Sequence, residues 1–359
     1  MGLKIIHCAD IHFDSAMSGM QDMSKVNIRR EDMKKTFQKI ISLSQNADML
    51  LIAGDLFDAK TVSKSTLAFL KEEFSKIENT PVFIIAGNHD YLSEESPYRT
   101  FDFGENVHIF ANEMECFESD EYDVYGISFK TANDEREMLS GFSVKNPDKI
   151  NICLMHGNLS GADYNPIKIA DIENSGLDYL ALGHIHKATE IKKAGNTHYA
   201  YCGCPEGKGN DETGEKGVYA IELIKGNLLN AQFVPVCTRM YFDEEIDVKN
   251  ASSYDEILEK INERYQGEKH IYRFTLTGAC GFPIDTEVLK EKIDGFSITV
   301  RDKTTPNVDL YKLSEEFSLK GLFLKYALAE KESISEEEFN EAVKAGLYYI
   351  EKEENNENR

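Results

Sequence analysis

The feature that most constrains the fold of this 359-residue chain is a set of short apolar segments that each end in Asp, His or Asn. The five segments are residues 4–8, 49–53, 82–86, 150–155 and 177–182. Each has the length of a buried strand, and helix-like segments separate several of them. In an α/β fold the polar residues at the carboxyl ends of strands come together. The pattern therefore predicts an α/β fold with a functional site at these strand ends.

The clusters contain side chains that bind divalent metal ions. The candidate ligands are Asp10, His12, Asp55, Asn88, His156, His184 and His186. Oxygen and imidazole donors without thiolate suit manganese, with iron or zinc as alternatives. The Asp55 carboxylate has two oxygens and can bridge a pair of ions, which leaves about four ligands for each ion. Such a pair can bind a phosphate, generate a hydroxide and stabilise the leaving oxygen.

Two further residues of the third cluster are candidates for acid–base chemistry. His89 directly follows Asn88, so we expect it to contact the phosphate and not a metal ion. Asp90 is expected to contact the other nitrogen of His89 and keep it protonated. His89 and Asp90 are therefore the predicted catalytic residues. The histidines outside the clusters are expected to pack in the core or lie at the surface; they are His7, His108, His198 and His270.

The hydrophobic pattern also predicts how the chain is divided. Helices are expected over residues 24–46 and 63–78, between strands. Residues 197–201, 217–224 and 228–236 are expected to form antiparallel strands at the flank of the sheet. The predicted domains are residues 1–236 with the site, residues 237–312 as a small α+β domain, and residues 313–359 as a helical segment.

The last helix is expected to begin at Ser335, with Glu338 completing a capping box. An apolar stripe runs along it, formed by Phe339, Val343, Leu347 and Ile350. One interpretation is that the stripe packs within its own domain. The other is that it binds a partner protein.

Composition restricts the partners and the compartment. The formal net charge of −23 argues against non-specific binding to nucleic acid, which depends on Lys and Arg at phosphates. The seven Cys residues are scattered and odd in number, which is typical of a reducing compartment. The sequence has no leader-like start and no apolar run close to 18 residues, so we expect a cytoplasmic protein without membrane spans.

The motifs, in their order, carry a family resemblance. Asp-x-His, Gly-Asp, Gly-Asn-His-Asp, His-Gly and Gly-His-x-His resemble the signature of calcineurin-like metallophosphoesterases. Residues 5–12 and 53–58 are similar to the SbcD-type DNA-repair nucleases in particular. Residues 204–207 and 212–217 also resemble that group. Asp58 and Asp14 differ from parts of it, because archaeal and eukaryotic relatives have His at the first position and SbcD usually has Gly at the second.

The resemblance implies a metallophosphoesterase sandwich of mixed β-sheets flanked by helices, with a smaller C-terminal α+β cap domain and a helical tail. It implies a two-metal phosphodiesterase that cleaves DNA as an exonuclease or endonuclease in DNA repair. Asp10, His12, Asp55 and His186 would bind one ion, and Asp55, Asn88, His156 and His184 the other. The implied partners are DNA, an SbcC-like coiled-coil ATPase and a second copy of the chain.

Two other classes of function remain open. One is a metallophosphatase, or a phosphodiesterase for cyclic nucleotides or other small molecules, that uses the same site; the acidic charge favours it. The other is a non-catalytic scaffold, which the complete ligand set disfavours.

Overall fold

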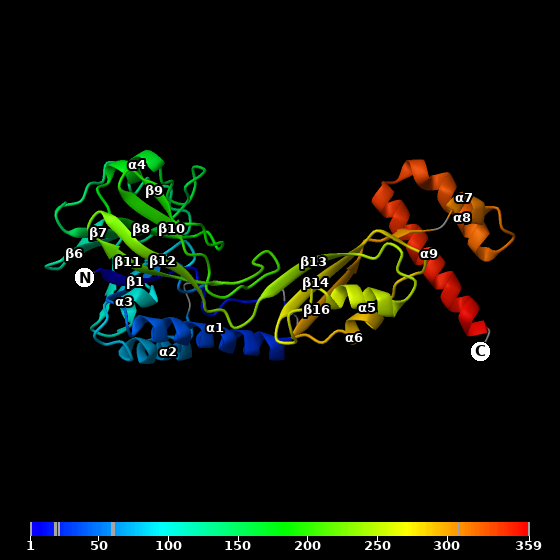
Figure 1. Ribbon diagram of the computed structural model, residues 1–359, viewed down its shortest axis with the longest axis horizontal. Coiled ribbons are helices and arrows are strands. Elements are labelled where there is room, and N and C mark those ends of the chain that lie inside the picture. The colour runs from blue at the N-terminus through cyan, green and yellow to red at the C-terminus, as the bar shows by residue number, and fades with distance from the viewer. Residues whose placement is uncertain (1, 18–19, 21, 59–61, 308, 358–359) are drawn as a thin grey trace. The chain divides into compact units, whose positions relative to one another are not determined.

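The computed structural model describes residues 2–17, 20, 22–58, 62–307 and 309–357. The chain divides into two compact units, Met1–Met240 and Tyr241–Arg359, called here the N-terminal and C-terminal units (Figure 1). The predicted boundary near residue 237 lies close to this division. The C-terminal unit includes both residues 241–312 and the helices that follow, and a separation at residue 312 stays a prediction.

The N-terminal unit contains two six-stranded sheets. The first has the order β12-β11-β1-β2-β3-β4 and the second the order β5-β6-β7-β8-β10-β9. The strands of the first are β1 (Leu3–Cys8), β2 (Met49–Ala53), β3 (Val82–Ile85), β4 (Val107–Ile109), β11 (Gly217–Ile224) and β12 (Asn227–Pro235). Those of the second are β5 (Glu115–Glu118), β6 (Tyr122–Gly126), β7 (Ile150–His156), β8 (Tyr179–Gly183), β9 (Lys192–Ala194) and β10 (Thr197–Tyr201). The five apolar segments thus lie in two sheets.

Alternation along the strands explains how the sheets pack. Leu51 of β2 and Leu154 of β7 belong to one core cluster between the sheets. The neighbouring Ile52 belongs to another, with Phe37 of α1 (Met23–Ser44) and Phe74 of α2 (Lys64–Ser75). α4 (Ile169–Asn174) covers the outer face of the second sheet through Ile172 (Figure 1). The predicted α/β sandwich of mixed sheets is confirmed.

The sequence prediction for the flanking strands is correct in part. β11 pairs antiparallel with both β1 and β12, as expected. β10 does not belong to that flank, because it pairs parallel with β8 in the second sheet. The chain leaves β8 and first forms β9, which runs antiparallel to β10. Because of this extra reversal, β10 runs parallel to β8.

A buried ionic network fixes the segment between β10 and β11. Arg29 of α1 is fully buried and donates to Asp32 at 3.0 Å and to Glu206 at 2.7 Å. The other oxygen of Glu206 accepts hydrogen bonds from Thr36 and from the backbone of Thr238. Buried charges are tolerated where they are paired and hydrogen-bonded in this way. The segment that begins at Glu206 is therefore anchored before it approaches the functional site.

The C-terminal unit is built on a parallel three-stranded sheet of order β13-β14-β16. Its strands are β13 (Tyr241–Asp247), β14 (Ile271–Thr277) and β16 (Ser297–Asp302), with the short strands β15 (Ala279–Cys280) and β17 (Thr305–Pro306) beside them in sequence. Its helices are α5 (Tyr254–Asn262), α6 (Thr286–Glu291), α7 (Leu310–Ser314), α8 (Leu319–Glu330) and α9 (Glu336–Glu357), and α3 (Pro97–Thr100) is the remaining helix of the N-terminal unit.

The apolar stripe of α9 packs inside the C-terminal unit. Phe339, Val343 and Leu347 are buried and form a cluster with Leu324 of α8. The interpretation of these three side chains as a surface for a partner is therefore wrong, because α8 already covers them. The predicted capping box is confirmed, since Glu338 donates its backbone N–H to Ser335 Oγ and accepts from the Ser335 backbone at 2.9 Å.

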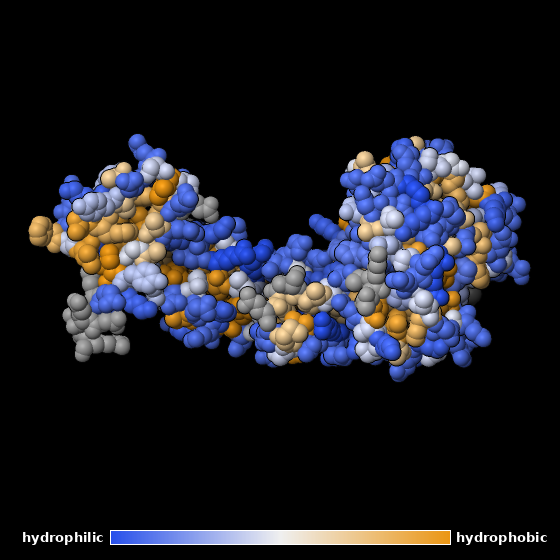
Figure 2. Space-filling model, turned by 180° about the vertical axis from the view of Figure 1, so that it is seen from behind, coloured by the Kyte–Doolittle hydropathy of each residue, from blue (hydrophilic) through white to orange (hydrophobic). Residues whose placement is uncertain are grey.

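α8 also carries apolar residues on its outer side. Leu319, Leu322 and Tyr326 follow each other at helical spacing and are exposed, and Phe317 precedes them. Figure 2 shows that apolar side chains reach the surface of the C-terminal unit. None of the described helices has the length and apolar character that a membrane span requires.

Candidate two-metal site

The candidate ligands lie at the carboxyl ends of strands from both sheets. Four of them have left-handed backbone conformations, namely Asp10, His12, Asp55 and His184, with φ between 50° and 104°. Non-glycine residues rarely adopt such angles, and where they do, a functional constraint is a common cause. Gly54 also has φ 92°, and a Cβ there would lie 2.3 Å from Nδ1 of His156. The local backbone is therefore shaped to bring polar side chains close together.

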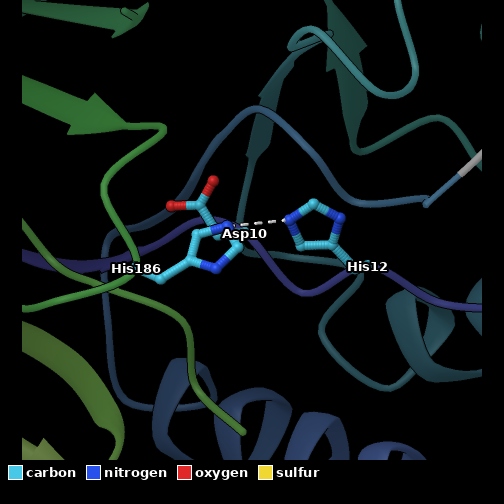
Figure 3. A group of neighbouring side chains, drawn as sticks. All are labelled: Asp10, His12 and His186. Carbon is cyan, nitrogen blue, oxygen red and sulfur yellow. Dashed lines mark hydrogen bonds between the residues drawn. The ribbon is translucent and has the colours of Figure 1, made fainter. Parts of the chain in front are cut away.

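Asp10, His12 and His186 form the first group of donors (Figure 3). Their ligand atoms lie within 4.8 Å of one another. Asp10 and His12 follow β1, whereas His186 follows β8 of the other sheet. The Asp10 carboxylate also accepts the backbone N–H of His184, at 3.0 Å to one oxygen.

The tautomers of His12 and His186 test whether a metal ion fits this group. Nδ1 of His12 lies 2.9 Å from Asp58 Oδ1, and Nδ1 of His186 lies 2.5 Å from Glu212 Oε1. Each carboxylate favours the proton on Nδ1, so both Nε2 atoms are left as acceptors. These two Nε2 atoms are 3.1 Å apart (Figure 3). Two lone pairs at this distance repel each other unless a cation lies beside both, so the donor set fits a metal ion.

The second group is formed by Asp55, Asn88, His156 and His184. Asn88 Oδ1 lies 2.9 Å from His156 Nε2 and 3.1 Å from His184 Nδ1. His156 Nδ1 faces the carbonyl oxygen of Ala53 at 3.0 Å, which again directs the proton away from the site. Asp55 Oδ2 is 3.5 Å from His156 Nε2 and 3.6 Å from His12 Nε2. Asp55 is thus adjacent to both groups, as a bridging ligand requires.

The pKa shifts of the buried ligands show that the Asp55 carboxylate and the neighbouring imidazoles interact electrostatically. Burial acts to raise the pKa of Asp55, but the imidazoles of His156, His12 and His89 outweigh it, and the pKa lies well below its ordinary value. Burial acts to lower the pKa of His156, but the Asp55 carboxylate raises it to about 9. The pKa of His184 is lowered to about 4, by burial and then by His156. Without a metal ion, a proton on His156 therefore neutralises the Asp55 charge.

His89 lies at the open side of the site, but its contact differs from the prediction. Its ring is 44% exposed, and Nδ1 lies 3.5 Å from Asp58 Oδ1. Asp90 is buried and accepts from Gly87 N, Phe57 N and the Tyr98 hydroxyl. The predicted contact between Asp90 and His89 is therefore wrong, because three other donors occupy the Asp90 carboxylate. Burial and the Asp55 charge raise the pKa of Asp90 to about 6.

Two carboxylates of the site have roles that the sequence did not reveal. Asp58 holds His12 and faces His89, although the sequence marks its position only as a departure from relatives. Glu212 holds His186 and is fixed by the backbone N–H of Lys208 at 2.6 Å. Burial acts to raise the pKa of Glu212, but the hydrogen bond to His186 and the charge of Lys208 lower it to about 2. Its place in a segment similar to SbcD-type nucleases was the available signal.

This arrangement of donors can be compared with known proteins. A profile of the calcineurin-like phosphoesterases matches residues 3–188, which is more than half of the chain and contains every predicted ligand. The chain belongs to this family. Calcineurin-like phosphoesterases use a dinuclear metal centre, and the two groups of donors described above are the candidates for it.

Alignments with relatives in the family extend beyond the residues that the profile matches. The uncharacterised metallophosphoesterase YhaO of Bacillus subtilis is 28% identical over 300 residues, which cover 77% of this chain and 72% of YhaO. The SbcD component of the nuclease SbcCD from Staphylococcus epidermidis is 26% identical, over 77% of this chain and 79% of that protein. The DNA double-strand break repair protein Mre11 of Methanopyrus kandleri is 24% identical, over 65% of this chain and 57% of that protein.

Proposed function

We propose that this calcineurin-like phosphoesterase is a two-metal phosphodiesterase that cleaves DNA in the manner of the SbcD-type nucleases, in DNA repair. The observation that carries the proposal is the complete and convergent donor set, with Asp55 between its two groups. The similarity to a subunit of the nuclease SbcCD over 77% of the chain, and to a DNA double-strand break repair protein over 65%, supports DNA as the substrate.

The residues of the site have separate roles in the proposed hydrolysis. Asp10, His12, Asp55 and His186 would hold one ion, and Asp55, Asn88, His156 and His184 the other, with manganese as the first candidate. When bound, the ions supply Lewis-acid stabilisation of the phosphate and a lowered pKa of the attacking water. Asp58 and Glu212 orient His12 and His186 so that Nε2 faces the site.

His89 is proposed to act on the phosphate as the general acid. Asp58 faces its Nδ1, which leaves Nε2 of the half-exposed ring to donate a proton to the leaving oxygen. The backbone N–H of His89 also donates to Asp55 Oδ1 at 2.9 Å. This bond links the position of the acid to that of the bridging carboxylate. Asp90 supports the loop from inside and does not contact the substrate in this mechanism.

The second candidate is a phosphatase or a phosphodiesterase of small molecules, including cyclic nucleotides. The net charge of −23 favours it, because a long polyanion is repelled by an acidic surface. Incubation of the purified protein and Mn²⁺ with end-labelled duplex, single-stranded DNA and bis-p-nitrophenyl phosphate separates the two. Cleavage of either DNA supports the nuclease. Hydrolysis of the model diester alone supports the small-molecule enzyme.

We further propose that an SbcC-like coiled-coil ATPase binds the outer side of α8, at Leu319, Leu322 and Tyr326, which replaces the stripe of α9 as the candidate surface. Exposed apolar patches of this kind commonly mark interaction sites. Leu322→Lys should lose capture of the ATPase in a pull-down while the melting temperature stays unchanged. Tyr349→Lys, at an exposed position of α9, is the matched control and should keep binding. Capture that survives Leu322→Lys contradicts this assignment.

The proposed location and assembly follow the same relatives. All seven Cys residues are free thiols, which fits a reducing compartment such as the cytoplasm. A homodimer is the proposed assembly, and sedimentation of the purified chain would test it.

A further inference from the structure

The loop that follows β7 contains a strained turn beside the metal site. Tyr164 and Asn165 have consecutive left-handed conformations, with φ of 57° and 50°. For a bulky residue such as Tyr this backbone is a true outlier. Strain of this kind persists only where the surroundings determine it, and it concentrates at functional sites.

The turn is held by contacts on its inner side. Asn165 is fully buried, and its Nδ2 donates to the carbonyl oxygen of His156 at 2.9 Å. Its Oδ1 accepts from the backbone of Met138 at 3.0 Å. A Cβ at Gly157 would lie 2.5 Å from the Asn165 carbonyl oxygen and 2.7 Å from that of Tyr164, so glycine is needed for this close approach. The backbone of the turn at Tyr164 and Asn165 is therefore fixed by its neighbours.

The outcome is an aromatic ring placed against a candidate metal ligand. The centroid of the Tyr164 ring lies 5.0 Å from the centroid of the His184 ring, and the angle between the two ring planes is 35°. Tyr164 is partly exposed and belongs to none of the hydrophobic core clusters formed by the described residues. Its hydroxyl makes no hydrogen bond to another group in the described part of the chain. The strain thus serves neither the core nor a bond of the hydroxyl.

We propose that Tyr164 is a substrate-positioning residue that stacks on the nucleobase next to the scissile phosphodiester. This inference rests on the proposed function and names the part of the substrate that the site recognises. The ring lies one side chain away from Asn88, which His184 contacts at 3.1 Å, so a nucleoside attached to the phosphate reaches it. Stacking suits any base, because every base has a π-face.

Stacking on an aromatic ring is especially useful to a protein with a strongly negative net charge. A net charge of −23 weakens the ionic attraction to phosphates that most DNA-binding proteins use. The neighbour Asp163 is itself exposed and acidic. A contact between aromatic rings needs no positive charge, so it can hold a nucleotide where ionic contacts are scarce.

The test compares oligothymidylate with an oligomer of the same length in which every nucleotide is an abasic tetrahydrofuran residue. The wild-type protein with Mn²⁺ is expected to prefer oligothymidylate by about 5- to 150-fold in kcat/KM, mainly through KM. Tyr164→Asn removes the ring but keeps a residue that tolerates the left-handed backbone, and it should reduce this preference to about one. Tyr164→Phe retains the ring and should retain the preference.

Each result has a defined meaning. A similar loss on both oligomers in Tyr164→Asn would show that the ring only supports His184, and it would overturn the inference. Equal cleavage of both oligomers by the wild type would overturn the inference and leave the nuclease function standing. Hydrolysis of bis-p-nitrophenyl phosphate without cleavage of either oligomer would overturn the nuclease function and the inference together.

Discussion

The two units differ in the polar side chains that they bury and in the apolar side chains that they expose. Among the described residues, all but two of the buried polar or charged side chains belong to the N-terminal unit. Eight of the twelve exposed large apolar side chains belong to the C-terminal unit, which is only about a third of the chain. Burying polar groups is costly unless each is paired, and exposing apolar groups is costly unless something covers them. The difference agrees with the proposals above, which place the chemistry in the first unit and a partner surface in the second.

The largest effect is expected from the residue that joins both groups of donors. Asp55→Asn should lower metal occupancy at both positions and reduce hydrolysis by more than about 10⁴-fold, since the metal chemistry is lost as a whole. Elemental analysis and kinetics would measure this. Asp178→Asn is the matched control, because Asp178 is a buried carboxylate of the same unit that accepts from Asn151 N and Gly226 N. Normal two-metal stoichiometry in Asp55→Asn would refute the bridging role.

The second largest effect is expected from the proposed general acid. His89→Ala should retain both ions and lose about 10²–10⁴-fold in kcat on a model diester, which is typical of general acid–base catalysis. His198→Ala, at a partly exposed histidine of β10, should remain near the wild type. Loss of an ion in His89→Ala would instead make His89 a ligand, a role that its proximity to His12 and Asp55 permits.

The helices of the C-terminal unit allow the two sides of one helix to be compared. Leu324 of α8 is fully buried against α9, whereas Leu322 is 53% exposed. Leu324→Ala should lower the free energy of unfolding of this unit by about 2–5 kcal/mol. Leu322→Ala should change it by less than about 0.5 kcal/mol. Denaturant titration followed by circular dichroism measures both, and equal values would contradict the assignment of inner and outer sides.

A smaller effect is expected from the carboxylate that orients His186. Glu212→Gln keeps the shape of the side chain but weakens its hold on Nδ1, so metal affinity should fall by about 10–100-fold. Activity should recover at high Mn²⁺. Glu215→Gln, an exposed position of the same segment, should leave the affinity unchanged. An unaltered affinity in Glu212→Gln would show that packing alone holds His186.

The smallest effect concerns pH. His156 has a pKa raised to about 9 in the metal-free protein, so at neutral pH it carries a proton that a metal ion must displace. Apparent metal affinity should therefore rise with pH, by at most about tenfold per unit for this proton, and level off near the pKa. Calorimetry in buffers of different ionisation enthalpy would count the proton released at neutral pH. If no proton is released, the Asp55 carboxylate is not paired with a protonated His156 in the metal-free protein.

The α/β class, the strand ends and the seven candidate ligands could all be predicted from local sequence. Strands such as β2 are short, apolar and followed at once by Gly54 and Asp55, so element and donor appear together in one stretch of letters. Helix capping at Ser335 is local for the same reason, since its donor and acceptor are three residues apart.

Other features depend on residues that are distant in sequence, and only the tertiary structure decided them. Asp90 faces Tyr98 and Phe57 and not the adjacent His89, because its carboxylate lies in the interior, where donors from other segments surround it. Glu212 reaches His186 because the segment from Glu206 is anchored on α1, and no spacing rule connects these positions. Whether the stripe of α9 is core or surface depended on α8, which covers it. Periodicity reveals that a helix has an apolar face, but the packing partner decides whether that face is exposed.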